Sequence, residues 1–134
     1  MNDTRHDMDD QMRAVLSAFP QIELAVLYGS FARGQQRPDS DIDIAVSAQR
    51  PLTADETIAL IEALAGQTGR AIDLVDLRVA GEPLLGQIVR HGRRLFGSGS
   101  AYGQLISRHL FEQADFMPYR NRVLAQRRAA WIGK

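Results

Sequence analysis

Apolar residues recur at two different spacings along this chain, and the changes of spacing mark the expected elements. They recur every three or four positions over Asp7–Phe19, over Thr53–Ala65 and over Glu82–Val89. This spacing places the apolar side chains on one face of a helix. Thr53 stands where it can cap the second of these segments, which continues with acidic residues in its first turn. The pattern therefore predicts three amphipathic helices.

Between these segments lie short apolar runs that are typical of strands. Ile22–Tyr28 is rich in branched and aliphatic residues, Asp41–Val46 alternates polar and apolar positions, and Ala71–Leu77 is apolar with two aspartates. Strands that alternate with helices in this order predict one domain of the α/β (α+β) class, with a single sizeable core for its 134 residues.

The first predicted strand ends abruptly at Gly29-Ser30, which indicates a tight turn. Ser30 stands where a helix would begin, and its hydroxyl could cap that helix. The free backbone N–H groups there would favour an anion. Gly-Ser pairs are also common in ordinary turns, so this pair alone does not decide between the two interpretations.

Two aspartates open the second predicted strand on one face. Side chains alternate along a strand, so Asp41 and Asp43 point the same way, with Cα atoms roughly 6.5 Å apart. Two carboxylates so placed could share a metal ion, although aspartates also solvate edge strands. A calcium loop of the EF-hand type is excluded, because Asp43 is followed by Ile44-Ala45-Val46 and not by the glycine and glutamate such a loop needs.

Asp73 lies in the middle of the third predicted strand. A carboxylate among apolar residues is costly unless it is paired, solvated or bound to a metal. If this strand lies beside the second one, Asp73 would reach the same metal as Asp41 and Asp43. Asp76, nearer the end of the strand, is expected to serve a turn or cap.

Composition excludes several other kinds of chemistry. Cysteine is absent, which excludes thiolate catalysis, disulfides and cysteine-based zinc sites, and the only lysine is Lys134, which excludes a Walker A loop and a kinase lysine. No apolar run is long enough to span a membrane, and the formal net charge is zero. We expect a cytoplasmic protein that neither enters a membrane nor binds nucleic acid directly.

The combination of Gly29-Ser30, ten intervening residues and Asp41-Ile42-Asp43 resembles the DNA polymerase β-like nucleotidyltransferase superfamily. In its short length the chain is similar to the minimal nucleotidyltransferase (MNT) branch of that superfamily. The members of this branch are antitoxins paired with HEPN-type toxins. The resemblance implies a small mixed sheet flanked by helices. It also implies that ATP is the substrate and that Gly29 and Ser30 bind its phosphates. Asp41, Asp43 and Asp73 are then the catalytic residues, and they hold two Mg²⁺ ions.

The resemblance further implies a fourth strand at Arg93–Phe96 and a division into a nucleotidyltransferase core over residues 1–97 and a helical C-terminal extension over residues 98–134. That extension carries arginines, Tyr119 and Trp131 that could face a partner. The implied function is transfer of AMP from ATP to a hydroxyl of a HEPN-type ribonuclease toxin, with a tyrosine as acceptor, which silences the toxin.

Three alternatives remain open from the sequence. A degenerate member would neutralise its partner by binding alone, a small-molecule nucleotidyltransferase of the antibiotic-modifying type would need an acceptor pocket from a dimer, and a template-independent RNA polymerase would need a charge that this chain lacks. Homo- and hetero-oligomers are both compatible with the sequence. The three histidines, His6, His91 and His109, lie far apart, and we assign them no metal or triad role.

Overall fold

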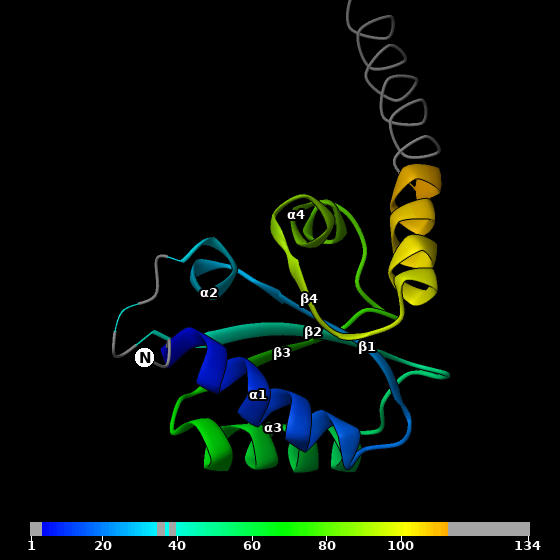
Figure 1. The fold of residues 1–134 in the computed structure, drawn as a ribbon. Coiled ribbons are helices and arrows are strands. Elements are labelled where there is room, and N and C mark those ends of the chain that lie inside the picture. Colours follow the sequence, from blue (N-terminus) through cyan, green and yellow to red (C-terminus); the bar gives the residue numbers. More distant parts are fainter. Residues whose placement is uncertain (1–3, 35–36, 38–39, 113–134) are drawn as a thin grey trace, which may run out of the picture.

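A four-stranded sheet with helices on both faces forms the body of the protein (Figure 1). The computed structural model describes residues 4–34, 37 and 40–112. Its elements are α1 (Thr4–Ser17), β1 (Ile22–Tyr28), α2 (Ser30–Arg33), β2 (Ile42–Ala48), α3 (Ala54–Thr68), β3 (Ile72–Asp76), α4 (Leu84–His91) and β4 (Arg93–Gly97). A further helix, whose described part covers residues 99–112, follows β4.

The sheet is mixed, with the order β3-β2-β1-β4. β1 lies in the centre and pairs antiparallel with β2 and with β4, whereas β3 pairs parallel with β2 at the edge. The parallel pair requires a crossover, which α3 supplies. The mixed sheet flanked by helices confirms the expected fold class.

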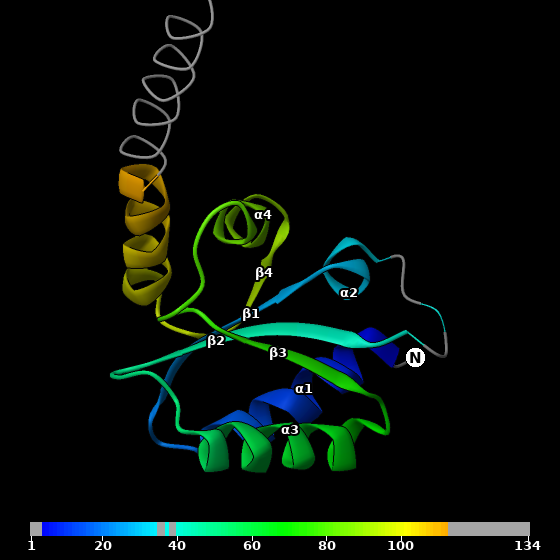
Figure 2. The same ribbon diagram turned by 180° about the vertical axis from the view of Figure 1, so that it is seen from behind.

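The helices form two layers, one on each face of the sheet. Figures 1 and 2, which view the molecule from opposite sides, both place α1 and α3 on one face and α2, α4 and the helix over residues 99–112 on the other. Among the described helices none is long and apolar enough to cross a membrane.

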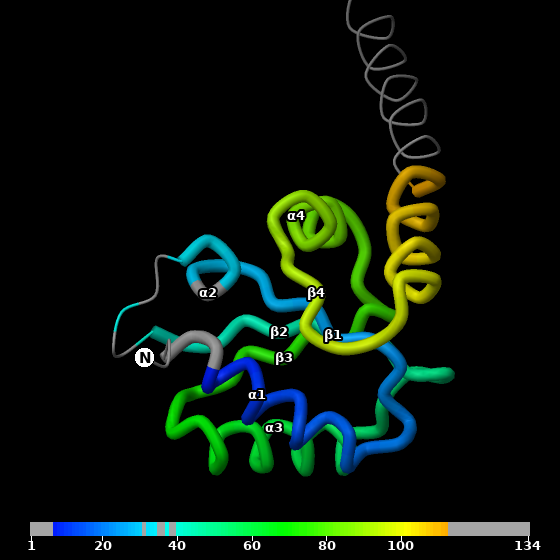
Figure 3. The backbone as a smooth tube through the Cα atoms, viewed as in Figure 1, coloured from blue at the N-terminus to red at the C-terminus, as the bar shows by residue number. Residues whose placement is uncertain are grey.

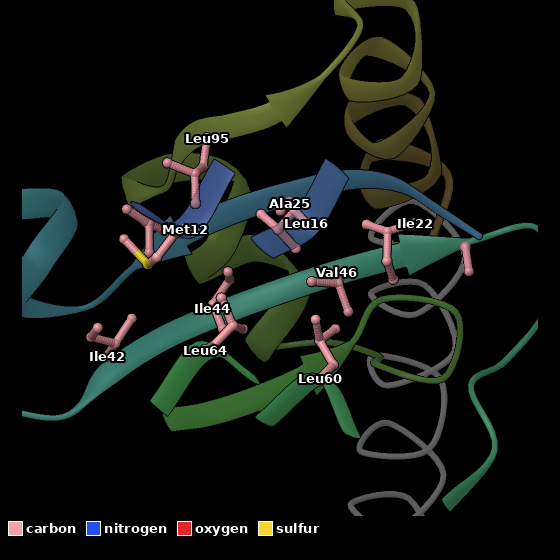
Figure 4. Close-up of a cluster of buried hydrophobic side chains, with 12 residues drawn as sticks. Met12, Leu16, Ile22, Ala25, Ile42, Ile44, Val46, Leu60, Leu64 and Leu95 are labelled. Carbon is pink, nitrogen blue, oxygen red and sulfur yellow. The ribbon is translucent and has the colours of Figure 1, made fainter. Parts of the chain in front are cut away.

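The α1/α3 face of the sheet carries the larger part of the core. Figure 4 shows side chains of β1, β2 and β4 that meet those of the two helices. Ile42, Ile44 and Val46 alternate along β2 toward this face, where they pack with Leu16 of α1 and Leu64 of α3. This alternation leaves the side chains between them, Asp43 among them, for the opposite face.

The opposite face has a smaller apolar cluster. Val26 and Ala45 of the sheet pack there with Leu85 and Ile88 of α4 and with Leu105 of the C-terminal helix. His109 of that helix is buried and pairs through Nδ1 with the carboxylate of Glu82, just before α4. Apolar packing and this pair together hold α4 in place on the sheet.

The strands lie close to where the sequence predicted them. β1 has the predicted bounds, while β2 begins one residue later and continues two residues further, so Asp41 precedes the strand. The predicted cap of α3 is confirmed as a capping box: the Thr53 hydroxyl accepts from Glu56 N–H, and the Glu56 carboxylate accepts from Thr53 N–H. Arg93–Gly97 confirms the expected fourth strand.

The chain passes almost directly from β4 into the following helix. Gly97 ends β4, and Ser98 caps that helix, where its Oγ accepts from Ala101 N–H at 3.0 Å. Residues 113–134, which include the expected docking tail, lie outside the described residues, so the boundary between core and extension stays a prediction.

Candidate active site

The Gly-Ser turn lies at the end of β1 and differs in one detail from the expectation. Gly29, with φ +70°, is the residue that precedes α2, and Ser30 is the first residue of that short helix, with no side-chain cap. The Ser30 hydroxyl therefore does not cap α2, contrary to the prediction. A helix of four residues leaves its first N–H groups outside the helical pattern, so Ser30 keeps both a hydroxyl and an N–H for another partner.

The three strands bring the turn and two of the aspartates together. Asp43 of β2 lies opposite Asp73 of β3 in the parallel pair, and opposite Tyr28 of β1 in the antiparallel pair. Residues that lie directly opposite share a face of the sheet, so these three side chains lie in a row. Ile42 and Ile44, on either side of Asp43, pack toward α1 and α3, so this row faces the opposite side of the sheet. Figure 3 shows α2 and α4 on that side.

Gly29 touches this row at close range. A Cβ atom at Gly29 would lie 2.2 Å from Oδ2 of Asp43, far inside van der Waals contact. The turn therefore needs glycine for two reasons, since the left-handed φ also disfavours other residues. The space between the turn and the Asp43 carboxylate has no room for a side chain at this position.

Like charges and burial shape the electrostatics of the site. Burial, and then the neighbouring carboxylate of Asp73, raise the pKa of Asp43, with a further contribution from Asp41. Burial, followed by the charges of Asp73 and Asp43, raises the pKa of Tyr28 to about 12. The Tyr28 phenol thus stays protonated at any physiological pH and can only donate from its O–H or accept at its oxygen.

The carboxylates suit a magnesium site in their chemistry. Mg²⁺ prefers oxygen ligands and takes one or two carboxylates together with substrate phosphates. Asp43 and Asp73 interact directly, and no ion pair joins either of them to a basic side chain among the described residues. A divalent cation would relieve the repulsion that raises the pKa of Asp43.

The three aspartates nevertheless do not form a closed cage. Within the described ranges, no three acidic, histidine or cysteine side chains are arranged to hold a metal by themselves. Asp41 precedes β2 and is exposed, and Asp73 is also exposed, because β3 is the edge strand. Exposure keeps the desolvation cost of the Asp73 carboxylate small, so burial gives no argument for a functional role. Asp73 remains a candidate because it lies directly opposite Asp43 in the sheet.

A cavity of about 360 Å³ opens beside this row. Its lining combines residues of the predicted motif with residues that the sequence did not single out: Tyr28, Gly29, Arg33, Asp43, Gln87 and His91. Gln87 and His91 come from α4, more than forty residues after Asp43. Their spacing of four on a helix with polar residues on one side was the only sequence signal that could have identified them.

The raised pKa of Asp43 leads to a stability prediction. The folded protein binds the Asp43 proton more tightly than the unfolded chain does, so this group's contribution to stability is full below its ordinary pKa of 3.8 and is lost as pH rises through the folded value. Asp43→Asn should therefore raise the melting temperature at pH 7 in EDTA, and this gain should vanish at about pH 3, below the ordinary pKa of the carboxyl group.

Melting temperatures measured with Mg²⁺ complete this test. The ion should raise the melting temperature of the wild-type protein and leave that of Asp43→Asn nearly unchanged, because the variant lacks the charge that attracts it. Glu62→Gln, an exposed position on α3, is the matched control and should behave like the wild type. Equal responses of Asp43→Asn and the wild type to pH and to Mg²⁺ would contradict the prediction.

Comparison with known proteins agrees with this geometry. Residues 10–100 match the family model described as polymerase beta, nucleotidyltransferase. The chain is 40% identical over 79 residues to the protein adenylyltransferase MntA of Shewanella oneidensis, an alignment that covers 59% of this chain and 57% of that protein. The chain thus spans less than two thirds of this curated relative.

Two solved structures resemble the fold over nearly its whole length. A crystal structure of a toxin–antitoxin with AMP-PNP has a TM-score of 0.78 and 28% identity, and the match covers 88% of this chain and 96% of that one. A tri-AMPylated Shewanella oneidensis HEPN toxin in complex with an MNT antitoxin gives a TM-score of 0.67 at 28% identity, over 90% and 98% of the two chains. Because the family model covers more than half of the sequence, this chain belongs to the polymerase β nucleotidyltransferase family.

Proposed function

We propose that this protein is an antitoxin that transfers AMP from ATP to a hydroxyl of a HEPN-type toxin, in an Mg²⁺-dependent reaction in the cytoplasm. The observation that carries the proposal is the row of Asp43 and Asp73 beside the Gly29 turn, at the mouth of a cavity large enough for a nucleotide's phosphates. The likeness to an adenylyltransferase and to AMPylated toxin complexes supports the choice of AMP as the transferred group.

Transfer of a nucleotidyl group demands positioning and charge neutralisation more than covalent help from the protein. In this proposal Gly29 and Ser30 bind the phosphates through backbone N–H groups and the Ser30 hydroxyl, and Asp41, Asp43 and Asp73 hold two Mg²⁺ ions. A metal held there would supply charge neutralisation at the phosphates and would make the attacking hydroxyl more acidic. Asp73, at the open edge of the sheet, accepts the proton of that hydroxyl.

The reaction balances as a substitution at phosphorus. The acceptor oxygen forms a bond to the α-phosphorus of ATP, the bond from that phosphorus to the bridging oxygen breaks, and pyrophosphate leaves. A protein acceptor fits the site, because Asp73 is exposed on the edge strand and a large partner can approach it from solvent. A tyrosine hydroxyl is the acceptor we propose.

Intact-mass measurement of the toxin tests this directly. The partner, incubated with this protein, ATP and Mg²⁺, should gain the mass of one or more adenylyl groups, and its ribonuclease activity should fall in step. The added anionic group would block an RNA-binding surface by repulsion and by its volume. Asp73→Ala is the control variant and should leave the mass of the toxin unchanged.

The same experiment distinguishes the proposal from its alternatives. Loss of toxicity without added mass, or equal protection by Asp73→Ala, would mean that this protein neutralises its partner by binding alone. Turnover of ATP with no change in any protein would instead indicate a small-molecule acceptor. Each outcome replaces the proposal with one stated alternative.

A further inference from the structure

One wall of the cavity that Asp43 lines belongs to α4. This helix lies outside the Gly-Ser and aspartate motif. Gln87 and His91 line the cavity from this helix, and both side chains are exposed to it. They are four residues apart, so they lie one above the other on the same helix face. The aspartate motif explains one side of the cavity only.

α4 is held firmly enough to position these two side chains. Leu85 and Ile88, on its inner face, are fully buried in the smaller apolar cluster. A Cβ atom at Gly92, just after the helix, would lie 2.2 Å from the Ile88 carbonyl oxygen and 2.5 Å from Cγ1 of Val26. The end of α4 that carries His91 is therefore packed tightly against β1, and His91 projects from a rigid element.

The lining has opposite charges on opposite sides. Asp43 is the acidic group of the lining, whereas Arg33 at the end of α2 is cationic and Gln87 and His91 of α4 offer N–H donors. A polyphosphate cannot contact Asp43 without an intervening cation, but Arg33, Gln87 and His91 all offer N–H donors that bind phosphate oxygens directly. The side of α2 and α4 is thus the side that suits anionic groups.

We propose that Gln87 and His91 of α4 bind the β and γ phosphates of ATP from the wall opposite the Gly-Ser turn, and so position the pyrophosphate that leaves during transfer. This inference rests on the proposed function, because it assumes that ATP occupies the cavity. Gln87 and His91 are positioning residues in this scheme: they hold the leaving group in line with the acceptor and take no part in proton transfer.

The affinities for ATP, AMP and pyrophosphate distinguish a contact with the β and γ phosphates from a purely structural role of Gln87 and His91. We expect His91→Ala and Gln87→Ala to weaken the affinity for ATP and for pyrophosphate in Mg²⁺ by about 10- to 100-fold, the range that a hydrogen bond to a charged group provides. Affinity for AMP should stay unchanged, since AMP lacks both phosphates. Isothermal calorimetry with ATP, AMP and pyrophosphate measures all three.

Two further variants make the test specific. His91→Lys places another N–H donor at the same position and should retain most of the affinity for pyrophosphate. Arg90→Ala removes an exposed cation from the neighbouring position of α4, which is not part of the cavity lining, and should leave all three affinities unchanged. Melting temperatures of the variants confirm that each one folds.

The possible outcomes are distinct. Equal losses for AMP and ATP would overturn the inference in favour of a contact with the base or ribose, and unchanged affinities would overturn it outright. A wild-type protein that binds Mg²⁺-ATP but modifies no toxin would refute the proposed function and leave the phosphate contacts standing. A wild-type protein that binds neither ATP nor pyrophosphate would refute both.

Discussion

Replacement of both Asp41 and Asp43 with alanine is expected to abolish Mg²⁺-dependent binding of ATP and to lower AMP transfer by at least about 10³-fold. Metal neutralisation of phosphate charge contributes several kcal/mol to such reactions, and each 1.4 kcal/mol corresponds to a factor of ten in rate. The double variant leaves Asp73 alone on an exposed edge strand, and one carboxylate cannot hold two ions against water.

Calorimetric titration of ATP with and without Mg²⁺ measures the first effect, and the rate of toxin modification measures the second. The fold should survive, because Asp41 is exposed and the like charges at Asp43 oppose folding at neutral pH. Glu62→Ala on the exposed face of α3 serves as the control and should retain wild-type behaviour. An affinity for ATP that does not change with Mg²⁺, or with the double substitution, would contradict the assignment of a metal to these aspartates.

Gly29→Ala is expected to be the most damaging single change in the turn. Its Cβ atom would overlap Oδ2 of Asp43 at 2.2 Å, so the carboxylate or the turn must move. The φ of +70° combined with the ψ of −148° lies in a region that is essentially restricted to glycine, which adds a backbone cost of roughly 1–3 kcal/mol for alanine. A displacement of about 1 Å at a reacting centre can lower the rate roughly 100-fold, and we expect AMP transfer to fall by at least that factor.

Gly66→Ala provides the matched control for this substitution. Gly66 lies within α3, and a Cβ atom there would meet nothing within 4 Å. Alanine is the better helix former, so this variant should gain roughly 0.5–1 kcal/mol in stability and keep full activity. If Gly29→Ala matched Gly66→Ala in rate and in affinity for ATP, the close approach of the turn to Asp43 would have no catalytic role.

The local pattern of the chain was sufficient to predict its elements. Alternation along β2 separated Ile42 and Ile44 from Asp43, and the three- and four-residue spacing gave α1, α3 and α4 close to their observed positions. These features depend on neighbours in sequence, and side-chain periodicity reports them directly. The Gly-Ser turn, Asp41 and Asp43 were singled out as candidates from the same local pattern.

Some features depend on contacts between distant segments, and the sequence could not reveal them. That β3 is an edge strand makes Asp73 an exposed residue, and only the strand order decides this. The close contact of Gly29 with Asp43 and the pairing of Glu82 with His109 arise from segments 14 and 27 residues apart, respectively, whose approach no local pattern encodes.

The candidate motif could thus be predicted from the sequence itself, because the Gly-Ser turn and the alternating aspartates lie within fifteen residues of one another along the chain. The second wall of the cavity was decided only by the tertiary structure. Gln87 and His91 line the same cavity as Asp43 because Leu85 and Ile88 bury the other side of α4 against the sheet, which fixes the rotation of the helix about its axis. Burial of apolar area sets that rotation, and it is a property of the packed core as a whole.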